Sequence, residues 1–269
     1  MTPQAAYEHC RRIARESRSS FYSGMRLLPH ERRAALFAVY ALARRIDDIA
    51  DGELPQAEKL DALAQVREAL AHIDVSDDPV LVAVADAARR LPIPLEAFGD
   101  LCEGAELDAR GASYETFAEL EHYCRCVAGS IGRLSLGVFD CSDRVRGAVL
   151  ADDLGVALQI GNVLRDIVED EANGRVYLPR EDVERFDGQL ELVIAFEAQR
   201  GLEWLERGLG LVPLLDRRST AAVLAMAGKY RVLLARIAAD PSVVLQGRIS
   251  LRPWEKGLVL ARSLAGVGG

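Results

Sequence analysis

Aromatic residues are scarce in this 269-residue chain. They make up 6% of the sequence, as seven Phe, seven Tyr and two Trp, although half of all residues are hydrophobic. The apolar content is therefore mostly Ala, Leu and Val, a composition that favours helices and excludes a disordered chain. A chain of this length can bury a substantial core.

Several widespread site motifs are missing. The sequence contains no GxGxxG, GxxxxGKS/T, HExxH or GxSxG, which argues against the nucleotide-binding loops, zinc proteases and serine hydrolases that these motifs mark. Four histidines lie far apart, and surface or structural roles are favoured over zinc ligation: His9, His30, His72 and His122. Five cysteines form no CxxC pair and are expected to be reduced, buried thiols: Cys10, Cys102, Cys124, Cys126 and Cys141.

Positive charge and long apolar runs are also limited. The chain has 33 Lys+Arg against 41 Asp+Glu, a net charge of −8, which argues against nucleic acid as a partner. The longest uncharged apolar run, Leu154 to Leu164, has 11 residues, whereas a membrane-spanning helix needs about 18. The N-terminus has no apolar h-region. We therefore expect a cytoplasmic protein without a secretory signal, and the sequence does not indicate an oligomeric state.

What is present along nearly the whole chain is helical periodicity. Apolar residues recur three or four positions apart, and Pro29, Gly52 and Pro55 fall at expected helix boundaries. No Gly/Ser-rich linker or repeat divides the chain. The pattern predicts an all-α fold, with one domain over residues 1–269. The expected helices span residues 3–17, 30–51, 56–72, 79–90, 94–109, 114–138, 143–171, 189–211, 217–239 and 252–264.

A first acidic row ends the second of these helices, in the segment AALFAVYALARRIDDIAD. The apolar stripe that includes Tyr40 continues to Asp47 in steps of three or four. Asp51 lies one turn further on the same side, and Asp48 flanks the pair. Carboxylates on a core-facing stripe require a cation or a positive partner. The alternative is a set of solvated Asp residues near a helix end, which the helix macrodipole disfavours.

A second acidic row lies in the segment LQIGNVLRDIVEDEANGRVY. Asn162, Asp166 and Asp170 are spaced i, i+4, i+8, which would place three oxygen donors along about 12 Å of one helix face. Oxygen ligands suit Mg²⁺ shared between carboxylates and substrate phosphates, and Gln159 precedes the row by one turn. The alternative is an ion-paired surface helix in which Arg165 pairs with a glutamate one turn later.

Two such rows on separate helices could each hold Mg²⁺ against a diphosphate. The metal would stabilise a departing diphosphate, and an apolar helical interior would shelter the carbocation that is left. The two rows together therefore indicate a site that ionises allylic diphosphates.

Further motifs accompany the acidic rows. They are SSFY at 19–22, LLP at 27–29, YALARRIDDIAD at 40–51, YCRCVAGSIG at 123–132 and ALQIGNVLRDIVEDEANGRVYLP at 157–179. In this order they resemble the squalene/phytoene synthase family along nearly the whole chain. The resemblance implies a single-domain isoprenoid synthase helical bundle with a central apolar pocket. It also implies a prenyltransferase that joins two prenyl diphosphates head to head with Mg²⁺, for which Mn²⁺ is an alternative.

The resemblance also implies roles for individual residues. Asp47, Asp48 and Asp51 would form the first Mg²⁺–diphosphate site. The second site would consist of Asn162, Asp166 and Asp170, and the expected metal ligands are Asp47, Asp51, Asn162, Asp166 and Asp170. The expected substrate contacts are Ser20, Phe21, Tyr40, Arg44, Tyr123, Gln159, Arg165 and Tyr177. A further acidic cluster around Glu103, Glu106 and Asp108 resembles the family only weakly, and we leave it out of the expected site.

Within the family, MRLLP, RRIDDIADGELP and YLPRED are most similar to bacterial presqualene diphosphate synthases of the squalene and hopanoid pathway. We therefore expect two farnesyl diphosphates to condense to presqualene diphosphate, with release of diphosphate and without NADPH. The alternative is a phytoene or dehydrosqualene synthase of carotenoid biosynthesis, which condenses two geranylgeranyl or farnesyl diphosphates. A long hydrocarbon product with a charged head also leads us to expect transient contact with a membrane surface.

Overall fold

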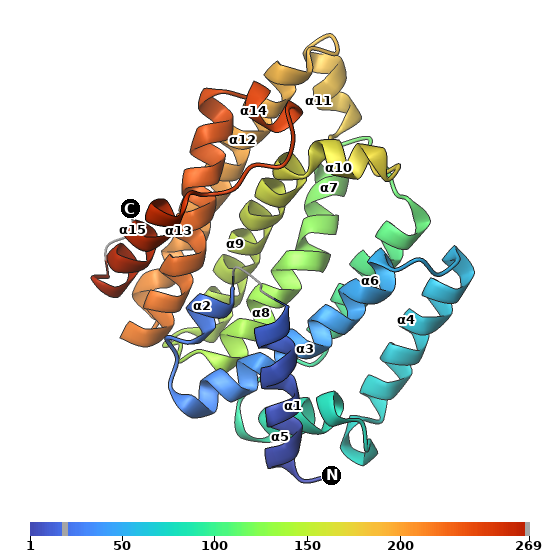
Figure 1. The fold of residues 1–269 in the computed structure, drawn as a ribbon, viewed down its shortest axis with the longest axis vertical. Coiled ribbons are helices and arrows are strands. Elements are labelled where there is room, and N and C mark those ends of the chain that lie inside the picture. Colours follow the sequence, from blue (N-terminus) through green and yellow to red (C-terminus); the bar gives the residue numbers. More distant parts are fainter. Residues whose placement is uncertain (18–20, 267–269) are drawn as a thin grey trace.

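The computed structural model describes residues 1–17 and 21–266, and these residues form helices joined by short turns (Figure 1). The helices are α1 (Pro3–Glu16), α2 (Tyr22–Met25), α3 (His30–Asp51), α4 (Gln56–Ala71), η1 (Ile73–Val75), α5 (Pro79–Arg90), α6 (Ala97–Arg110), α7 (Phe117–Cys124), the π turn η2 (Arg125–Gly129), α8 (Ser130–Val138), α9 (Arg144–Arg165), α10 (Ile167–Ala172), α11 (Arg180–Arg185), α12 (Leu190–Gly208), η3 (Leu209–Leu214), α13 (Arg217–Ala239), α14 (Ser242–Leu245) and α15 (Pro253–Leu264). The all-α prediction is confirmed.

Helix α9 runs through the middle of the bundle (Figure 1). It packs against α8, α12, α13 and the π turn η2, and it buries a continuous stripe that includes Leu154, Ala157 and Leu164. By length and composition α9 could cross a membrane, but more than half of its most apolar stretch is buried inside the bundle. Burial of that stripe is the main hydrophobic contribution that a core helix makes to folding.

Side-chain caps fix where several helices begin. Asp216 accepts hydrogen bonds from two backbone N–H groups in the first turn of α13, and Asp78 does the same for α5, directly before Pro79. Thr116 and Glu119 form a capping box at the start of α7. Each cap satisfies N–H groups that have no partner within the helix. These local signals explain why α5 and α13 begin where the sequence predicts.

Two expected helices are interrupted. The helix expected over 114–138 consists of α7, the π turn η2 and α8. The helix expected over 143–171 breaks at Asp166, whose backbone φ and ψ are −102° and 9°. Arg165 donates from Nε to the Asp166 carboxylate at 2.9 Å, a contact between adjacent residues whose side chains diverge in a regular helix. The expectation that the second acidic row lies on one uninterrupted helix is therefore wrong.

The helical spacing nevertheless survives the break. The N–H of Asp166 donates to the carbonyl of Asn162 at 2.9 Å, and the N–H of Asp170 donates to the carbonyl of Asp166 at 2.8 Å. The chain thus keeps i→i−4 hydrogen bonds on both sides of Asp166. Asn162, Asp166 and Asp170 stay one turn apart, although they belong to α9, to the break and to α10.

Close packing around α9 depends on glycine. A Cβ atom at Gly155 would lie 2.6 Å from the carbonyl carbon of Ala128 and 2.5 Å from the backbone nitrogen of Gly129. Side chains cannot fit at that separation, so α9 and the π turn are in backbone contact. This contact places the π turn against α9 about two helical turns before Asn162.

The thiol chemistry agrees with the sequence analysis. All five cysteines are free and buried. Burial raises the pKa of Cys10 and of Cys126 to about 12, so these thiols stay protonated and weakly nucleophilic at neutral pH.

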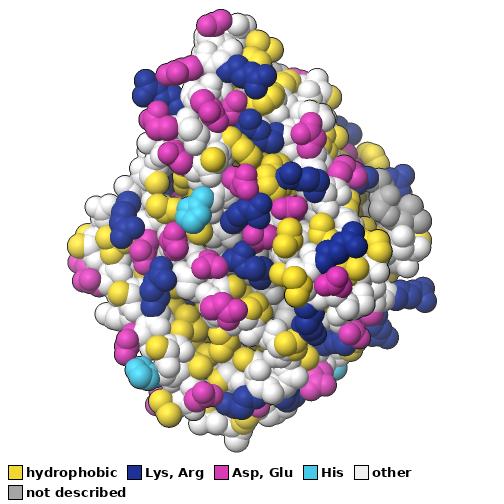
Figure 2. All heavy atoms as spheres, turned by 180° about the vertical axis from the view of Figure 1, so that it is seen from behind, with side chains coloured by type: hydrophobic (Ala, Val, Ile, Leu, Met, Phe, Trp, Pro, Cys, Tyr) yellow, Lys and Arg dark blue, Asp and Glu magenta, His cyan; other side chains and the backbone are white. Residues whose placement is uncertain are grey.

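The molecular surface mixes charges of both signs. On the face opposite to that of Figure 1, acidic and basic side chains alternate with hydrophobic ones (Figure 2). Neither sign of charge dominates that face (Figure 2).

Candidate active site

A cavity of about 470 Å³ lies between α3 and α9. Leu36 precedes Asp47 on α3 by about three turns, or about 16 Å, and Ala151 precedes Asn162 on α9 by the same distance. All four residues line the cavity, so it is long, with an apolar end and a polar end. The apolar end is formed by Leu36, Phe139, Ala151, Leu211 and Val223. This shape suits a ligand with a charged head and a long apolar tail.

The first acidic row contributes two carboxylates to the polar end. Asp47 and Asp51 line the cavity, as expected from their spacing on α3. Asp48 is not among the lining residues: its side chain is 58% exposed and pairs with Arg44 at 2.7 Å. The structure therefore brings Asp47 and Asp51 together and leaves Asp48 on the neighbouring surface.

The second acidic row lines the same end of the cavity from α9 and α10. Asn162, Asp166 and Asp170 all contribute to the lining. The Oδ1 atom of Asn162 accepts a hydrogen bond of 2.7 Å from the Tyr230 hydroxyl, and its Nδ2 donates to Gln159 at 3.1 Å. These two bonds fix the orientation of the Asn162 amide, with its oxygen held by a buried tyrosine.

Asp166 is neutralised by two guanidinium groups. Arg165 donates to both of its carboxylate oxygens, and Arg248 lies with its Nε 3.0 Å from Oδ1. Guanidinium groups bind phosphate oxygens with the same fork geometry that they use for carboxylates. Asp166 and a diphosphate would therefore compete for Arg165 and Arg248.

Negative charge at the polar end is incompletely balanced by these arginines. The pKa of Asp47 is raised to about 7, first because surrounding protein reduces its hydration and next because Asp51 is negative. The pKa of Asp170 is raised to about 6 by the same loss of hydration and by the charge of Asp166. Asp108 adds to both shifts. Carboxylates that repel one another in a recess are a common feature of ligand sites.

Asp108 itself comes from α6 and lines the cavity. Its two carboxylate oxygens accept hydrogen bonds from the hydroxyls of Tyr177 at 2.7 Å and Tyr123 at 2.9 Å. Burial raises the pKa of Asp108 and of both tyrosines, so both hydroxyls stay protonated as donors. Asp108 was not among the site residues expected from sequence, because its proximity to Tyr123 and Tyr177 could not be read from the chain.

Arg175 is a second site residue that the sequence analysis missed. It follows α10 and lines the cavity, and its Nη1 lies 2.9 Å from Oδ1 of Asp51. It thus connects the segment after the second acidic row to the end of the first. Its position two residues before YLP, directly after Asn173-Gly174, is the sequence signal that could have pointed to it.

Four of the expected substrate contacts come from residues 20–44. Phe21, Tyr40 and Arg44 line the cavity. Ser20 lies outside the described residues.

The polar end offers the donors that Mg²⁺ prefers. Asp47, Asp51 and Asp170 are carboxylate donors, and Asn162 contributes an amide oxygen. The pKa values of Asp47 and Asp170 are raised first by lost hydration and then by repulsion between carboxylates, and a bound divalent cation would offset both. This donor set therefore fits Mg²⁺, and Asp166 could join it once Arg165 and Arg248 pair with a phosphate.

The fold and this site define a prenyltransferase of the isoprenoid synthase type. The family model for squalene/phytoene synthase matches residues 14–255. The chain belongs to this family, whose members condense prenyl diphosphates head to head.

Among its relatives, the phytoene synthase of Mycobacterium tuberculosis is 46% identical over 277 aligned positions, which cover 97% of this chain and 91% of that protein. The phytoene synthase of Arthrospira platensis is 30% identical, and the alignment covers 96% of this chain and 92% of that protein. Both relatives therefore match this chain nearly end to end.

Solved structures show the same fold. A dehydrosqualene synthase bound to a ligand superposes with a TM-score of 0.89 at 27% identity, covering 98% of this chain and 96% of that one. The squalene synthase HpnC of Alicyclobacillus acidocaldarius superposes with a TM-score of 0.81 at 29% identity, covering 92% of this chain and 97% of that one. The expected isoprenoid synthase fold is thus confirmed.

Proposed function

We propose that this protein is a phytoene synthase, which condenses two geranylgeranyl diphosphates in a Mg²⁺-dependent reaction. The observation that carries the proposal is the 46% identity to a phytoene synthase over nearly the full length of both chains. It favours the carotenoid alternative over the presqualene diphosphate synthase that the short motifs suggested. Two of those motifs, RRIDDIADGELP and YLPRED, contribute residues to the polar end, which enzymes of both kinds need, so they carry little information on tail length.

The elongated cavity supports a substrate with a long tail. The diphosphates would lie at the polar end, against Arg165, Arg248 and Arg44, and the tails would extend toward Leu36 and Ala151. Mg²⁺ held by Asp47, Asp51, Asn162 and Asp170 would stabilise the charge that develops on the departing diphosphate. The apolar walls would exclude water from the carbocation.

The reaction balances without a reductant. One substrate loses diphosphate, and its allylic cation adds to the C2–C3 double bond of the second substrate; loss of a proton then closes a cyclopropane. Loss of the second diphosphate, rearrangement and loss of another proton give a C40 triene. Tyr123 and Tyr177 are poor proton acceptors. Their raised pKa values keep both side chains as neutral hydroxyls, not phenolates, and these hydroxyls already donate to Asp108. We assign both protons to released diphosphate.

The test is product identification with purified protein, Mg²⁺ and either C20 or C15 diphosphate, without NADPH. The proposal predicts a C40 triene from the C20 substrate, with kcat/KM at least about tenfold higher than for the C15 substrate. A C30 cyclopropyl diphosphate formed from the C15 substrate, with no C40 product, would contradict it.

We also propose that the protein acts in the cytoplasm and touches a membrane surface when it releases its hydrocarbon. Trp254 and Leu258 are exposed one turn apart on α15, next to Lys256 and Arg262, and tryptophan beside basic residues is typical of membrane interfaces. Trp254→Ala should weaken sedimentation with anionic vesicles, while Val145→Ala, at an exposed position of α9, should not. Equal sedimentation of both variants and the wild type would contradict this contact.

A further inference from the structure

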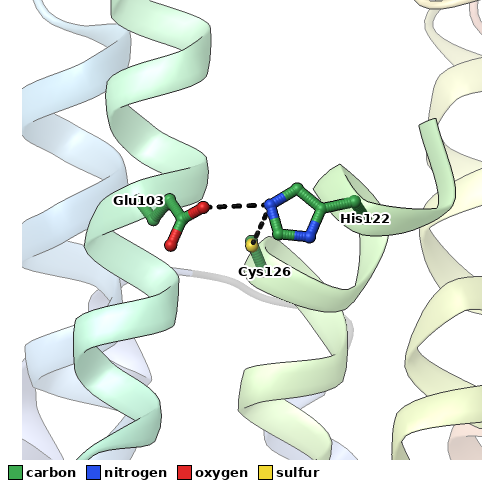
Figure 3. A group of neighbouring side chains, drawn as sticks. All are labelled: Glu103, His122 and Cys126. Atoms are coloured by element: carbon green, nitrogen blue, oxygen red, sulfur yellow. Dashed lines mark hydrogen bonds and ion pairs between the residues drawn. The ribbon is translucent and has the colours of Figure 1, made fainter. Parts of the chain in front are cut away.

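Glu103, His122 and Cys126 form a cluster outside the cavity. Figure 3 shows their side chains pointing toward one another between two helical segments. The Nε2 atom of His122 lies 2.9 Å from Oε1 of Glu103 and 3.7 Å from Sγ of Cys126. All three potential ligand atoms lie within 4.8 Å of one another, and none of these residues lines the cavity.

The local structure holds the three groups together. His122 lies on α7 and Cys126 in the π turn η2, four positions later, so both project to nearly the same side. Glu103 lies on α6, and its neighbour Gly104 allows α6 to approach: a Cβ there would lie 2.4 Å from Cγ1 of Val127. The close contact of α6 with the π turn brings Glu103 within reach of the other two.

We propose that Glu103, His122 and Cys126 form a binding site for a Zn²⁺-like divalent metal, separate from the Mg²⁺ site at the cavity. Thiolate and imidazole are ligands of Zn²⁺ and not of Mg²⁺. A tetrahedral zinc site with the usual Zn–S and Zn–N lengths places sulfur and nitrogen about 3.6 Å apart, and the observed separation is 3.7 Å. The carboxylate must move back by only about 0.4 Å to reach the oxygen–nitrogen separation that the same geometry requires.

Exposure and charge also suit a bound cation. Glu103 and His122 are exposed, whereas Cys126 is buried beneath them, so a metal could enter from solvent, with water as its fourth ligand. The ligand set of one thiolate, one carboxylate and a neutral imidazole would balance the two charges of the metal. Burial and the carboxylates of Glu103 and Asp100 raise the pKa of the Cys126 thiol to about 12. Metal binding would therefore release a proton from this thiol.

Occupation of the site would connect α6 to the wall of the cavity. Val127 and Ala128, which directly follow Cys126 in the π turn, line the cavity. A metal bridging Glu103 and Cys126 would hold this turn against α6. We infer that the bound metal stabilises the folded protein through this connection, whatever prenyl diphosphate the enzyme uses.

The test uses Co²⁺ as a spectroscopic substitute for Zn²⁺, added to EDTA-treated full-length protein in excess Mg²⁺, which occupies the oxygen ligands of the cavity. The proposal predicts one Co²⁺ per chain, a thiolate-to-cobalt charge-transfer band, and displacement of Co²⁺ by Zn²⁺. Saturating Zn²⁺ at about a hundredfold over Kd should raise Tm by about 5 °C. Cobalt binding without a thiolate band, or no shift in Tm, would overturn the proposal.

Variants separate this site from adventitious binding. Cys126→Ser should remove the thiolate band and weaken Zn²⁺ binding at least about 100-fold. If this buried substitution prevents folding, His122→Gln and Glu103→Gln, at exposed positions, should each weaken binding at least about tenfold. The matched control is His72→Gln: His72, directly after α4, pairs with Glu68 at 3.0 Å in a similar His–carboxylate contact, and its loss should leave Zn²⁺ affinity unchanged. Equal affinity in His122→Gln and His72→Gln would contradict the site.

Discussion

Tyr177 donates a hydrogen bond of 2.7 Å to Asp108, a residue 69 positions earlier in the chain. The bond joins the segment after the second acidic row to α6, and Tyr123 donates to the other carboxylate oxygen at 2.9 Å. The ring centroids of Tyr123 and Tyr177 lie 5.3 Å apart. Asp108 is thus held at the polar end of the cavity, where its charge acts on both acidic rows.

Tyr177→Phe should lower kcat by about tenfold to hundredfold, because it removes a hydrogen bond to a carboxylate that is worth about 1.5–3 kcal/mol. Steady-state kinetics with saturating Mg²⁺ measures the loss. Tyr114→Phe is the matched control: Tyr114 packs against the same two rings, and within the described part of the chain its buried hydroxyl has no hydrogen-bond partner. It should retain kcat and Tm. Equal losses in both variants would mean that ring packing, and not the Asp108 contact, is what matters.

Asp47→Asn should stabilise the metal-free protein at pH 8 while it removes activity. The folded-state pKa of about 7, against an ordinary value of 3.8, means that folding disfavours the charged carboxylate. The charged Asp47 carboxylate therefore destabilises the folded protein. This destabilisation is absent below about pH 4, grows between the two pKa values and reaches its full size above about pH 7. The gain in Tm of the variant, measured in EDTA, should therefore shrink from pH 8 to pH 5. Asp48→Asn, which alters an exposed carboxylate paired with Arg44, should show no such gain, and a gain independent of pH would contradict the assignment.

Arg175→Gln should raise KM for the diphosphate substrate at least about tenfold. Arg175 pairs with Asp51 and lowers the pKa of Asp108 and of Asp170, so its removal increases repulsion at the polar end. The acidic limb of the pH–rate profile should consequently move to higher pH. Arg180→Gln is a suitable control, since Arg180 is exposed and pairs with Glu184 away from the cavity. An unchanged KM in Arg175→Gln would show that this arginine has no part in substrate binding.

Val223→Phe should shift substrate preference from C20 toward C15 diphosphate. Val223 is buried on α13 and lines the apolar end of the cavity, so a larger side chain shortens the space for the tail. The ratio of kcat/KM for the two substrates should fall at least about tenfold. Val163→Ile, which adds one methylene near the polar end, serves as the comparison. A ratio that stays constant in Val223→Phe would place the tail elsewhere.

The parts of the fold that follow from local signals could be predicted. Helix α13 spans Arg217–Ala239 as expected, because its apolar period and its Asp216 cap are both visible in sequence. The position of Asp47 and Asp51 on the same side of α3 likewise follows from helical spacing. The break at Asp166 could not be predicted, since it accompanies a contact with Arg248, far along the chain.

The same distinction explains the site residues that were missed. Asp108 and Arg175 acquire their roles from partners 69 and 124 positions away, and no short pattern encodes such contacts. His122 and Cys126 share a helix face, but only the approach of α6 at Gly104 brings Glu103 to them. Substrate length is a further case, because it depends on residues from several helices at the apolar end.

We propose that the two acidic rows act together at one end of the cavity, and the most direct test is Mg²⁺-dependent turnover of Asp51→Asn, Asp170→Asn and Asp48→Asn. Asp51 and Asp170 line the cavity, whereas Asp48 does not. The account predicts that the first two variants lose about 100-fold to 1,000-fold in kcat, while Asp48→Asn stays within about threefold of the wild type. Full turnover by Asp51→Asn or Asp170→Asn would contradict it.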